Sequence, residues 1–101
     1  MKCYIAGKIS NMPESEYKRR FREGEAEVSA LGYIPVNPVE IDHNHDKSWL
    51  SFMRLDITHL LCCDAVYALN NWHESTGAKI EVNLALSLGI KVIFQLPSPK
   101  Q

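Results

Sequence analysis

Short runs of apolar residues alternate along this chain with longer segments whose apolar residues recur every three or four positions. The short runs have the length of strands, and an uninterrupted one such as Val66–Leu69 is typical of a strand buried on both faces of a sheet. The longer segments have the period of amphipathic helices, as in the stripe formed by Tyr17, Phe21 and Val28. Strict alternation of the two predicts a parallel sheet with helices on both faces.

Local signals set the ends of these elements and the order of the strands. Right-handed crossovers favour a flavodoxin-like or Rossmann-like three-layer sandwich with about four strands in the order 2-1-3-4. Pro35 cannot donate to a sheet ladder, which predicts that the second strand either lies at an edge or ends at this residue. We expect a single α/β domain over 1–96 and a tail over 97–101. The predicted strands are 4–6, 33–36, 65–69 and 91–95, and the predicted helices begin near Pro13, Ser48 and Ser75 and end near Gly32, Asp64 and Gly89.

Composition excludes several classes of protein. The chain has 101 residues, enough for one hydrophobic core, and its formal net charge of -1 gives no general attraction to a nucleic acid polymer or an anionic membrane. The start lacks the long apolar stretch of a secretory signal, so a cytoplasmic protein is expected. Cys62 and Cys63 are adjacent and the cysteine count is odd, which indicates reduced thiols rather than a disulfide framework.

Ligands of open α/β sheets bind at the carboxyl ends of the strands, close to the point where the strand order reverses. Four segments build this edge here: 7–11, 37–47, 70–75 and the chain after Gln95. Gly7 lets the backbone come close to a ligand, although it is equally consistent with a simple turn. The chain has neither a G-x-G-x-x-G motif nor a P-loop lysine motif, so neither a dinucleotide site nor a P-loop is indicated.

Two carboxylates on helices are candidates for chemistry. Glu81 lies inside the third helix beside apolar positions, where its side chain either points back to the strand ends or is simply exposed. Asp56 lies between Leu55 and Ile57 on a largely apolar helix, and Arg54 is available as an ion-pair partner. Ser75 begins the third helix, as either an anion site or a plain N-cap.

His43, His45 and Asp46 form a third cluster of polar side chains. The His-x-His-Asp pattern is compatible with zinc, but the sequence holds no obvious fourth ligand, and a solvated polar loop is the favoured interpretation. We assign no function to His59 or His73.

These features together resemble the nucleoside 2-deoxyribosyltransferase superfamily. Within it, the chain is most similar to the small DUF4406 domain family, and the resemblance extends from Tyr4 to about Phe94. The residues that carry it are Tyr4–Gly7 at the first strand, Asp56 eight residues before Asp64, the pattern Ser75-x-Gly77-x-x-x-Glu81 on the third helix, and the stretches Val36–Pro38 and Asn71–Ser75.

The resemblance implies catalytic residues. Glu81 matches the family glutamate that attacks C1′ of a 2-deoxyribose and forms a covalent glycosyl-enzyme, a step that suits a carboxylate because the transition state resembles an oxocarbenium ion. Asp56 matches the family aspartate that acts as an acid or orients the sugar. No metal or organic cofactor is implied. The substrate-binding residues that the resemblance implies are Tyr4, Gly7, Lys8, Ser10, Asn71, Ser75 and Gly77, with Asn83 as a weaker match.

The resemblance leaves the acceptor of the sugar open. A second base accepts it in the transferases, and water accepts it in the 5′-monophosphate hydrolases. Ser75 is closer to the hydrolases, where it would contact phosphate, yet the hydrolases carry an arginine at the position of Ser10, and Lys8 would have to replace its charge. The expected partner is a small deoxynucleoside or deoxynucleotide.

Two other functions compete with an enzyme. One is a non-catalytic nucleotide-binding or sensing module of the same fold. The other is an assembly protein in which Trp49 and Trp72 mark a subunit interface. A homo-oligomer is expected, and it is compatible with an enzyme too, because the resemblance implies a site that is commonly completed by a neighbouring subunit.

Overall fold

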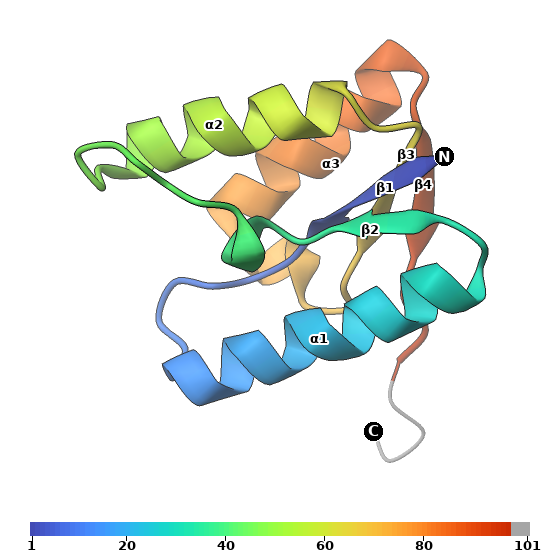
Figure 1. Ribbon diagram of the computed structural model, residues 1–101, viewed down its shortest axis with the longest axis horizontal. Helices are drawn as coiled ribbons and strands as arrows, with labels where there is room; N and C mark the ends of the chain where they lie inside the picture. The colour runs from blue at the N-terminus through green and yellow to red at the C-terminus, as the bar shows by residue number, and fades with distance from the viewer. Residues whose placement is uncertain (98–101) are drawn as a thin grey trace.

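Four parallel strands form the central sheet of the computed structural model, which describes residues 1–97 (Figure 1). The strands lie in the order β2-β1-β3-β4, and each neighbouring pair is parallel, so the predicted topology is confirmed. Apart from Pro97, the predicted tail lies outside the described residues. The elements are β1 (Lys2–Ala6), α1 (Glu14–Ala30), β2 (Ile34–Val36), the 3₁₀ helix η1 (Pro38–Glu40), α2 (Trp49–Leu61), β3 (Ala65–Ala68), the 3₁₀ helix η2 (Trp72–Glu74), α3 (Thr76–Leu88) and β4 (Lys91–Phe94).

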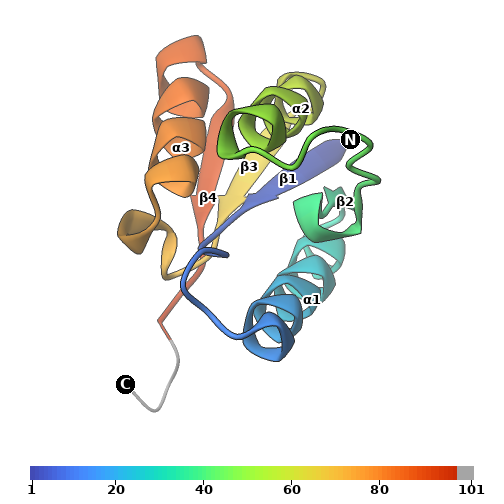
Figure 2. The ribbon, with the colours of Figure 1, turned by 90° about the vertical axis from the view of Figure 1, so that its left-hand side faces the viewer.

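Helix α1 covers one face of the sheet, and α2 and α3 cover the other (Figure 2). Successive side chains of a strand point to opposite faces, so β1 supplies both halves of the core. Cys3 and Ile5 pack with Phe21 of α1, whereas Tyr4 and Ala6 pack on the side of α2 and α3. The register of β1 therefore decides that the side chain of Tyr4 lies on the α3 side of the sheet.

The helix ends follow the predicted signals. The Ser48 hydroxyl accepts a hydrogen bond from the Ser51 amide, and the Ser75 hydroxyl accepts one from the Ala78 amide, both at 3.2 Å. Gly89 ends α3 at φ +77°, a left-handed conformation that favours glycine. No helix within residues 1–97 combines the length and the apolar character needed to cross a membrane.

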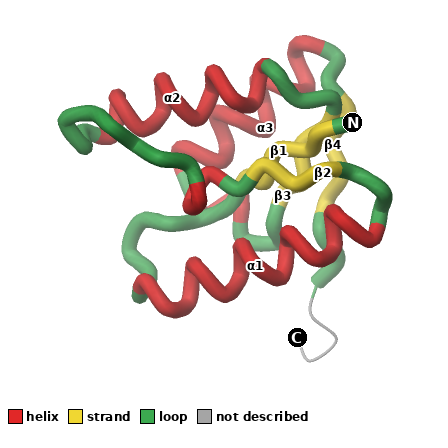
Figure 3. Tube along the Cα trace, viewed as in Figure 1, coloured by secondary structure: helices red, strands yellow, loops and turns green. Residues whose placement is uncertain are grey.

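The long segment between β2 and α2 projects beyond the first turn of α2 (Figure 3). It begins with η1, in which the Asn37 side chain accepts a hydrogen bond from the Val39 amide at 2.9 Å. Within residues 1–97, strand β2 lies at the edge of the sheet and pairs with β1, which is the first of the two possibilities that Pro35 left open. The loops that follow β1 and β2 thus begin on the same side of the molecule, at the carboxyl ends of these two parallel strands.

Leu69, directly after β3, is wedged between two glycines from different parts of the chain. It is 1% exposed. A Cβ atom on Gly7 would lie 2.5 Å from Leu69 Cδ1, and one on Gly24 would lie 2.9 Å from Cδ2. Glycine at both positions is therefore what lets the first loop and α1 approach this leucine.

Candidate active site

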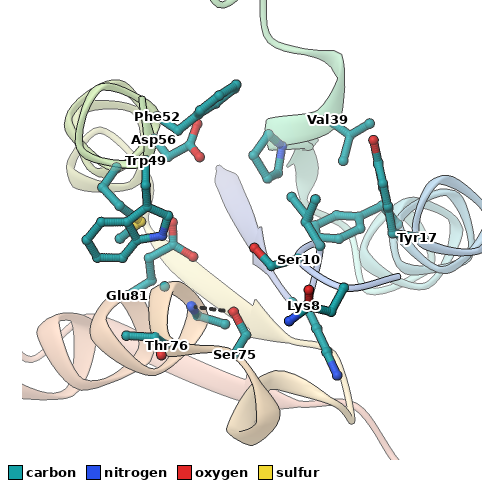
Figure 4. Close-up of a pocket in the computed structure, with 18 of the residues that line it drawn as sticks. Lys8, Ser10, Tyr17, Val39, Trp49, Phe52, Asp56, Ser75, Thr76 and Glu81 are labelled. Carbon is teal, nitrogen blue, oxygen red and sulfur yellow. Dashed lines mark hydrogen bonds between the residues drawn. The ribbon is translucent and has the colours of Figure 1, made fainter. Parts of the chain in front are cut away.

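A cavity of about 850 Å³ lies at the carboxyl ends of β1 and β3 (Figure 4). The loop after β1 and helix α1 form one side, and the first turns of α2 and α3 form the other. Its lining combines aromatic rings with carboxylates, which suits a ligand that has both a flat apolar part and polar groups. Of the predicted site residues, those that line it are Tyr4, Gly7, Lys8, Ser10, Asp56, Ser75, Gly77 and Glu81.

Glu81 is a buried carboxyl group inside this cavity. It is 5% exposed, and the hydroxyl of the fully buried Tyr4 donates a hydrogen bond to Glu81 Oε2 at 2.7 Å. Burial raises the pKa of Glu81 to about 8; the Tyr4 hydrogen bond opposes this rise, and the charge of Asp56 adds to it. The sequence left open whether Glu81 is exposed, and the structure places it inward.

Asp56 reaches the same cavity from α2. It is 8% exposed, and its Oδ1 lies 2.8 Å from His43 Nε2. Burial raises the pKa of Asp56, and the hydrogen bond with His43 acts in the opposite direction. Arg54, which the sequence offers as a possible ion-pair partner, lies on the exposed side of α2, and the partner of Asp56 comes from the long loop instead.

His43 belongs to a packed aromatic group rather than to the solvated loop that the sequence favoured. Its ring centroid lies 4.8 Å from that of Phe52 and 5.3 Å from that of His45. Among the described residues there is no group of three or more His, Cys, Asp or Glu side chains placed to hold a metal ion. Nothing local in the sequence signals the pairing of His43 with Asp56, since it depends on how a long loop folds back over α2.

The loop after β1 forms the polar floor of the cavity. Lys8 Nζ lies 3.5 Å from Glu74 Oε1 of η2. The Lys8 amide donates to Asn71 Oδ1 at 3.2 Å, and Asn71 is itself buried. The prediction that Asn71 contacts substrate is not supported, since Asn71 does not line the cavity. Its side chain is occupied in holding the loop that does.

Helices α2 and α3 approach each other closely at Gly77. A Cβ atom there would lie 3.1 Å from Met53 Sδ and 3.8 Å from Trp49 Nε1. Ser75 caps the same helix end, as its N-cap interpretation predicts, and also lines the cavity. The small residue at 77 therefore sets the separation of the two helices that carry Glu81 and Asp56.

The apolar side chains that line the cavity were not predicted from the sequence as site residues. Trp49, Phe52 and Met53 line it from α2, and Tyr17 and Phe21 line it from α1. Their helical spacing was visible, but a stripe of this kind indicates core as readily as a ligand wall. The weaker match Asn83 lies on the exposed side of α3 and does not line the cavity.

Two solved structures that are similar to this chain are described as 2-deoxyribosyltransferases. One, from the psychrotolerant bacterium Bacillus psychrosaccharolyticus, matches with a TM-score of 0.69 and 19% identity over 97% of this chain and 77% of its own. Another, from Leishmania mexicana, matches with a TM-score of 0.68 and 20% identity over 92% of this chain and 62% of its own. This chain thus shares the fold of these two 2-deoxyribosyltransferases, as the sequence resemblance implied.

This chain belongs to the DUF4406 family, a domain of unknown function, whose profile matches residues 1–94. No curated protein sequence is significantly similar to it. The family assignment from sequence is confirmed.

Proposed function

We propose that this protein cleaves the N-glycosidic bond of a 2-deoxynucleoside through a covalent intermediate on Glu81. One observation carries the proposal: a buried carboxyl group, hydrogen-bonded by a buried tyrosine, lies in the same cavity as a second carboxyl group from a neighbouring helix. Figure 4 shows Glu81 and Asp56 entering the cavity from α3 and α2. Paired carboxyl groups with different environments are what glycosidic cleavage uses.

The two carboxyl groups would divide the reaction between them. An oxygen of ionised Glu81 bonds to C1′ while the C1′–N bond breaks, and the electron pair of that bond stays on the base. Protonated Asp56 gives its proton to the departing base, which makes the base a better leaving group. A second base or a water molecule then takes the sugar from Glu81, and Asp56 removes the proton of that acceptor.

The charges at the polar end of the cavity favour a nucleoside over its 5′-monophosphate. Lys8 Nζ is paired with Glu74 at 3.5 Å, and Lys18 Nζ is paired with Glu14 at 2.9 Å, and all four residues line the cavity. A phosphate would have to compete with these two carboxylates for the lysines. We therefore expect the phosphorylated substrate to react more slowly.

Base release measured by chromatography tests the proposal. Purified protein is incubated with the common 2-deoxynucleosides and their 5′-monophosphates, with and without a free acceptor base. Glu81→Gln keeps the shape and removes the nucleophile, so its release should fall to background. Glu25→Gln makes the same chemical change on α1, away from the cavity lining, and should react like the unmodified protein.

The outcomes separate the candidate functions. Release that requires Glu81 and an acceptor base indicates a transferase, and release without the acceptor indicates a hydrolase. If no substrate loses its base but calorimetry detects binding of a nucleoside or nucleotide, the non-catalytic module is the correct function. Equal release by both variants would contradict Glu81 as the nucleophile.

A further inference from the structure

We propose that His43 is a positioning residue for Asp56, holding Oδ1 so that Oδ2 is left to give and take the proton of the base. This inference rests on the proposed function, because it assigns a role within the same reaction. It concerns a residue in the segment for which the sequence favours a solvated polar loop.

The geometry of the pair supports this role. His43 Nε2 and Asp56 Oδ1 are 2.8 Å apart, and the two side chains are only 11% and 12% exposed. Within residues 1–97, Asp56 Oδ2 has no hydrogen-bond partner, and both residues line the cavity. An imidazole N–H fixed on one oxygen therefore leaves the other oxygen available to a ligand.

Contacts within the loop between β2 and α2 hold the His43 ring beside Asp56. The His43 ring lies against Phe52, and His45 packs on Phe52 with a centroid distance of 4.6 Å. The Lys47 side chain donates a hydrogen bond to the His43 carbonyl oxygen, and the Lys47 amide donates to His45 Nδ1 at 3.0 Å. These contacts restrain the loop on α2, so the imidazole is oriented before a ligand arrives.

The hydrogen bond between His43 and Asp56 acts on the charge that Asp56 acquires during the reaction. The titratable groups that act on Asp56 are His43 and His45 from the loop, His59 on α2, Glu81 on α3 and Tyr4 on β1. Of the side chains described in residues 1–97, His43 alone is hydrogen-bonded to the Asp56 carboxyl group. When protonated Asp56 gives its Oδ2 proton to the base, it becomes a carboxylate, and the His43 Nε2–H bond to Oδ1 stabilises that charge. The total charge is unchanged, because the negative charge of Glu81 is lost as its ester forms.

A comparison of two substrates with different leaving groups distinguishes a positioning role of His43 from a general effect on the structure of the protein. One substrate is a natural 2-deoxynucleoside, and the other is a 2-deoxyriboside whose leaving group departs without a proton, such as a nitrophenolate. His43→Phe keeps an aromatic ring against Phe52 but removes the hydrogen bond. We expect kcat on the natural substrate to fall at least about tenfold, as part of the 10²–10⁴-fold that general acids contribute. The activated substrate should lose much less, and KM should change little for either.

Two further variants control for folding and for through-space charge. His43→Gln retains an amide N–H donor and should recover part of the lost rate. His59→Gln removes a histidine that acts on Asp56 without a hydrogen bond and should leave the ratio of the two substrates unchanged. Thermal unfolding of each variant shows whether it is folded. Equal losses on the two substrates, or no loss, would overturn the proposal.

A measurement independent of activity separates this inference from the proposed function. The carboxyl carbon of Asp56 is followed by NMR during a pH titration of the unmodified protein and of His43→Phe. Loss of the hydrogen bond should raise the pKa of Asp56 further, because it removes an interaction that favours the charged form. If no substrate is cleaved, the proposed function fails, and the titration still decides the pairing: an unchanged Asp56 curve would refute it.

Discussion

Replacing Tyr4 with phenylalanine tests how far its hydrogen bond favours the ionised form of Glu81. The ring stays in β1, and only the hydroxyl that donates to Glu81 Oε2 at 2.7 Å is lost. With a pKa of about 8, Glu81 is ionised in roughly one molecule in ten at neutral pH. A hydrogen bond to a charged group contributes about 1.5–3 kcal/mol. Its loss should lower that ionised fraction roughly tenfold to a hundredfold.

The assay is the rate of cleavage, as a function of pH, of the activated 2-deoxyriboside whose nitrophenolate leaves without a proton from Asp56, so that the profile reports the ionisation of Glu81 alone. The unmodified protein should become more active as the pH rises toward 8, because Glu81 must lose its proton before it attacks. Tyr4→Phe should show the same rise displaced to higher pH, with at least a roughly tenfold loss at neutral pH that narrows in more alkaline solution.

A second tyrosine provides the matched control. The Tyr67 hydroxyl donates to Glu27 Oε1 at 2.7 Å on the α1 face of the sheet, away from the cavity lining. Tyr67→Phe therefore deletes an equivalent hydrogen bond outside the site and should leave the pH profile in place. If Tyr4→Phe and the unmodified protein gain activity over the same pH range, the electrostatic reasoning about Glu81 is refuted.

Three other changes test stability and assembly. Near pH 4, Glu81→Gln should unfold at the same denaturant concentration as the unmodified protein. At pH 8 the variant should be more stable than the unmodified protein by up to about 4 kcal/mol. The reason is that burial raises the pKa of Glu81 from 4.5 to about 8, so between these pH values the folded protein holds a proton that the unfolded chain releases, and the unmodified protein loses stability as the pH rises. An unchanged difference across that range would contradict the burial argument. Gly7→Ala should cost about 1–3 kcal/mol in urea unfolding because its Cβ meets Leu69, and Leu69→Val should recover part of that loss; additive costs would show that the two do not clash. Leu50 and Leu61 lie eleven residues apart on one side of α2, and each is 52% exposed. Light scattering should therefore detect a homo-oligomer, and the double variant Leu50→Lys with Leu61→Lys should dissociate it. A monomeric unmodified protein would argue against association.

The sheet could be predicted from the sequence because its signals are local. Apolar runs, helix periods and caps at Ser48, Ser75 and Gly89 each depend on neighbours a few residues away. The handedness of crossovers then left few topologies to choose from. The two 3₁₀ helices were missed because each is a single short turn inside a polar loop.

The candidate site was predictable only where one element defines it. Glu81 and Asp56 each stand out within a single helix, and the structure brings both to one cavity. The sequence offers only Arg54, a near neighbour, as a possible partner of Asp56, whereas the side chain that binds Asp56 comes from thirteen residues upstream. Asn71 shows the converse: a polar residue at the right edge of the sheet was assigned to the ligand, but the backbone of Lys8 uses it.

Leu69 has a consequence for how sequence changes act on the cavity from a distance. One methyl group of this side chain limits the first loop at Gly7, and the other limits α1 at Gly24. The loop, the end of β3 and α1 thus form one mechanical unit, in which a bulkier residue on the helix displaces the leucine toward the loop. Variation at Gly24, on the far side of the sheet from Glu81, is therefore expected to alter ligand affinity without touching any group that contacts the ligand.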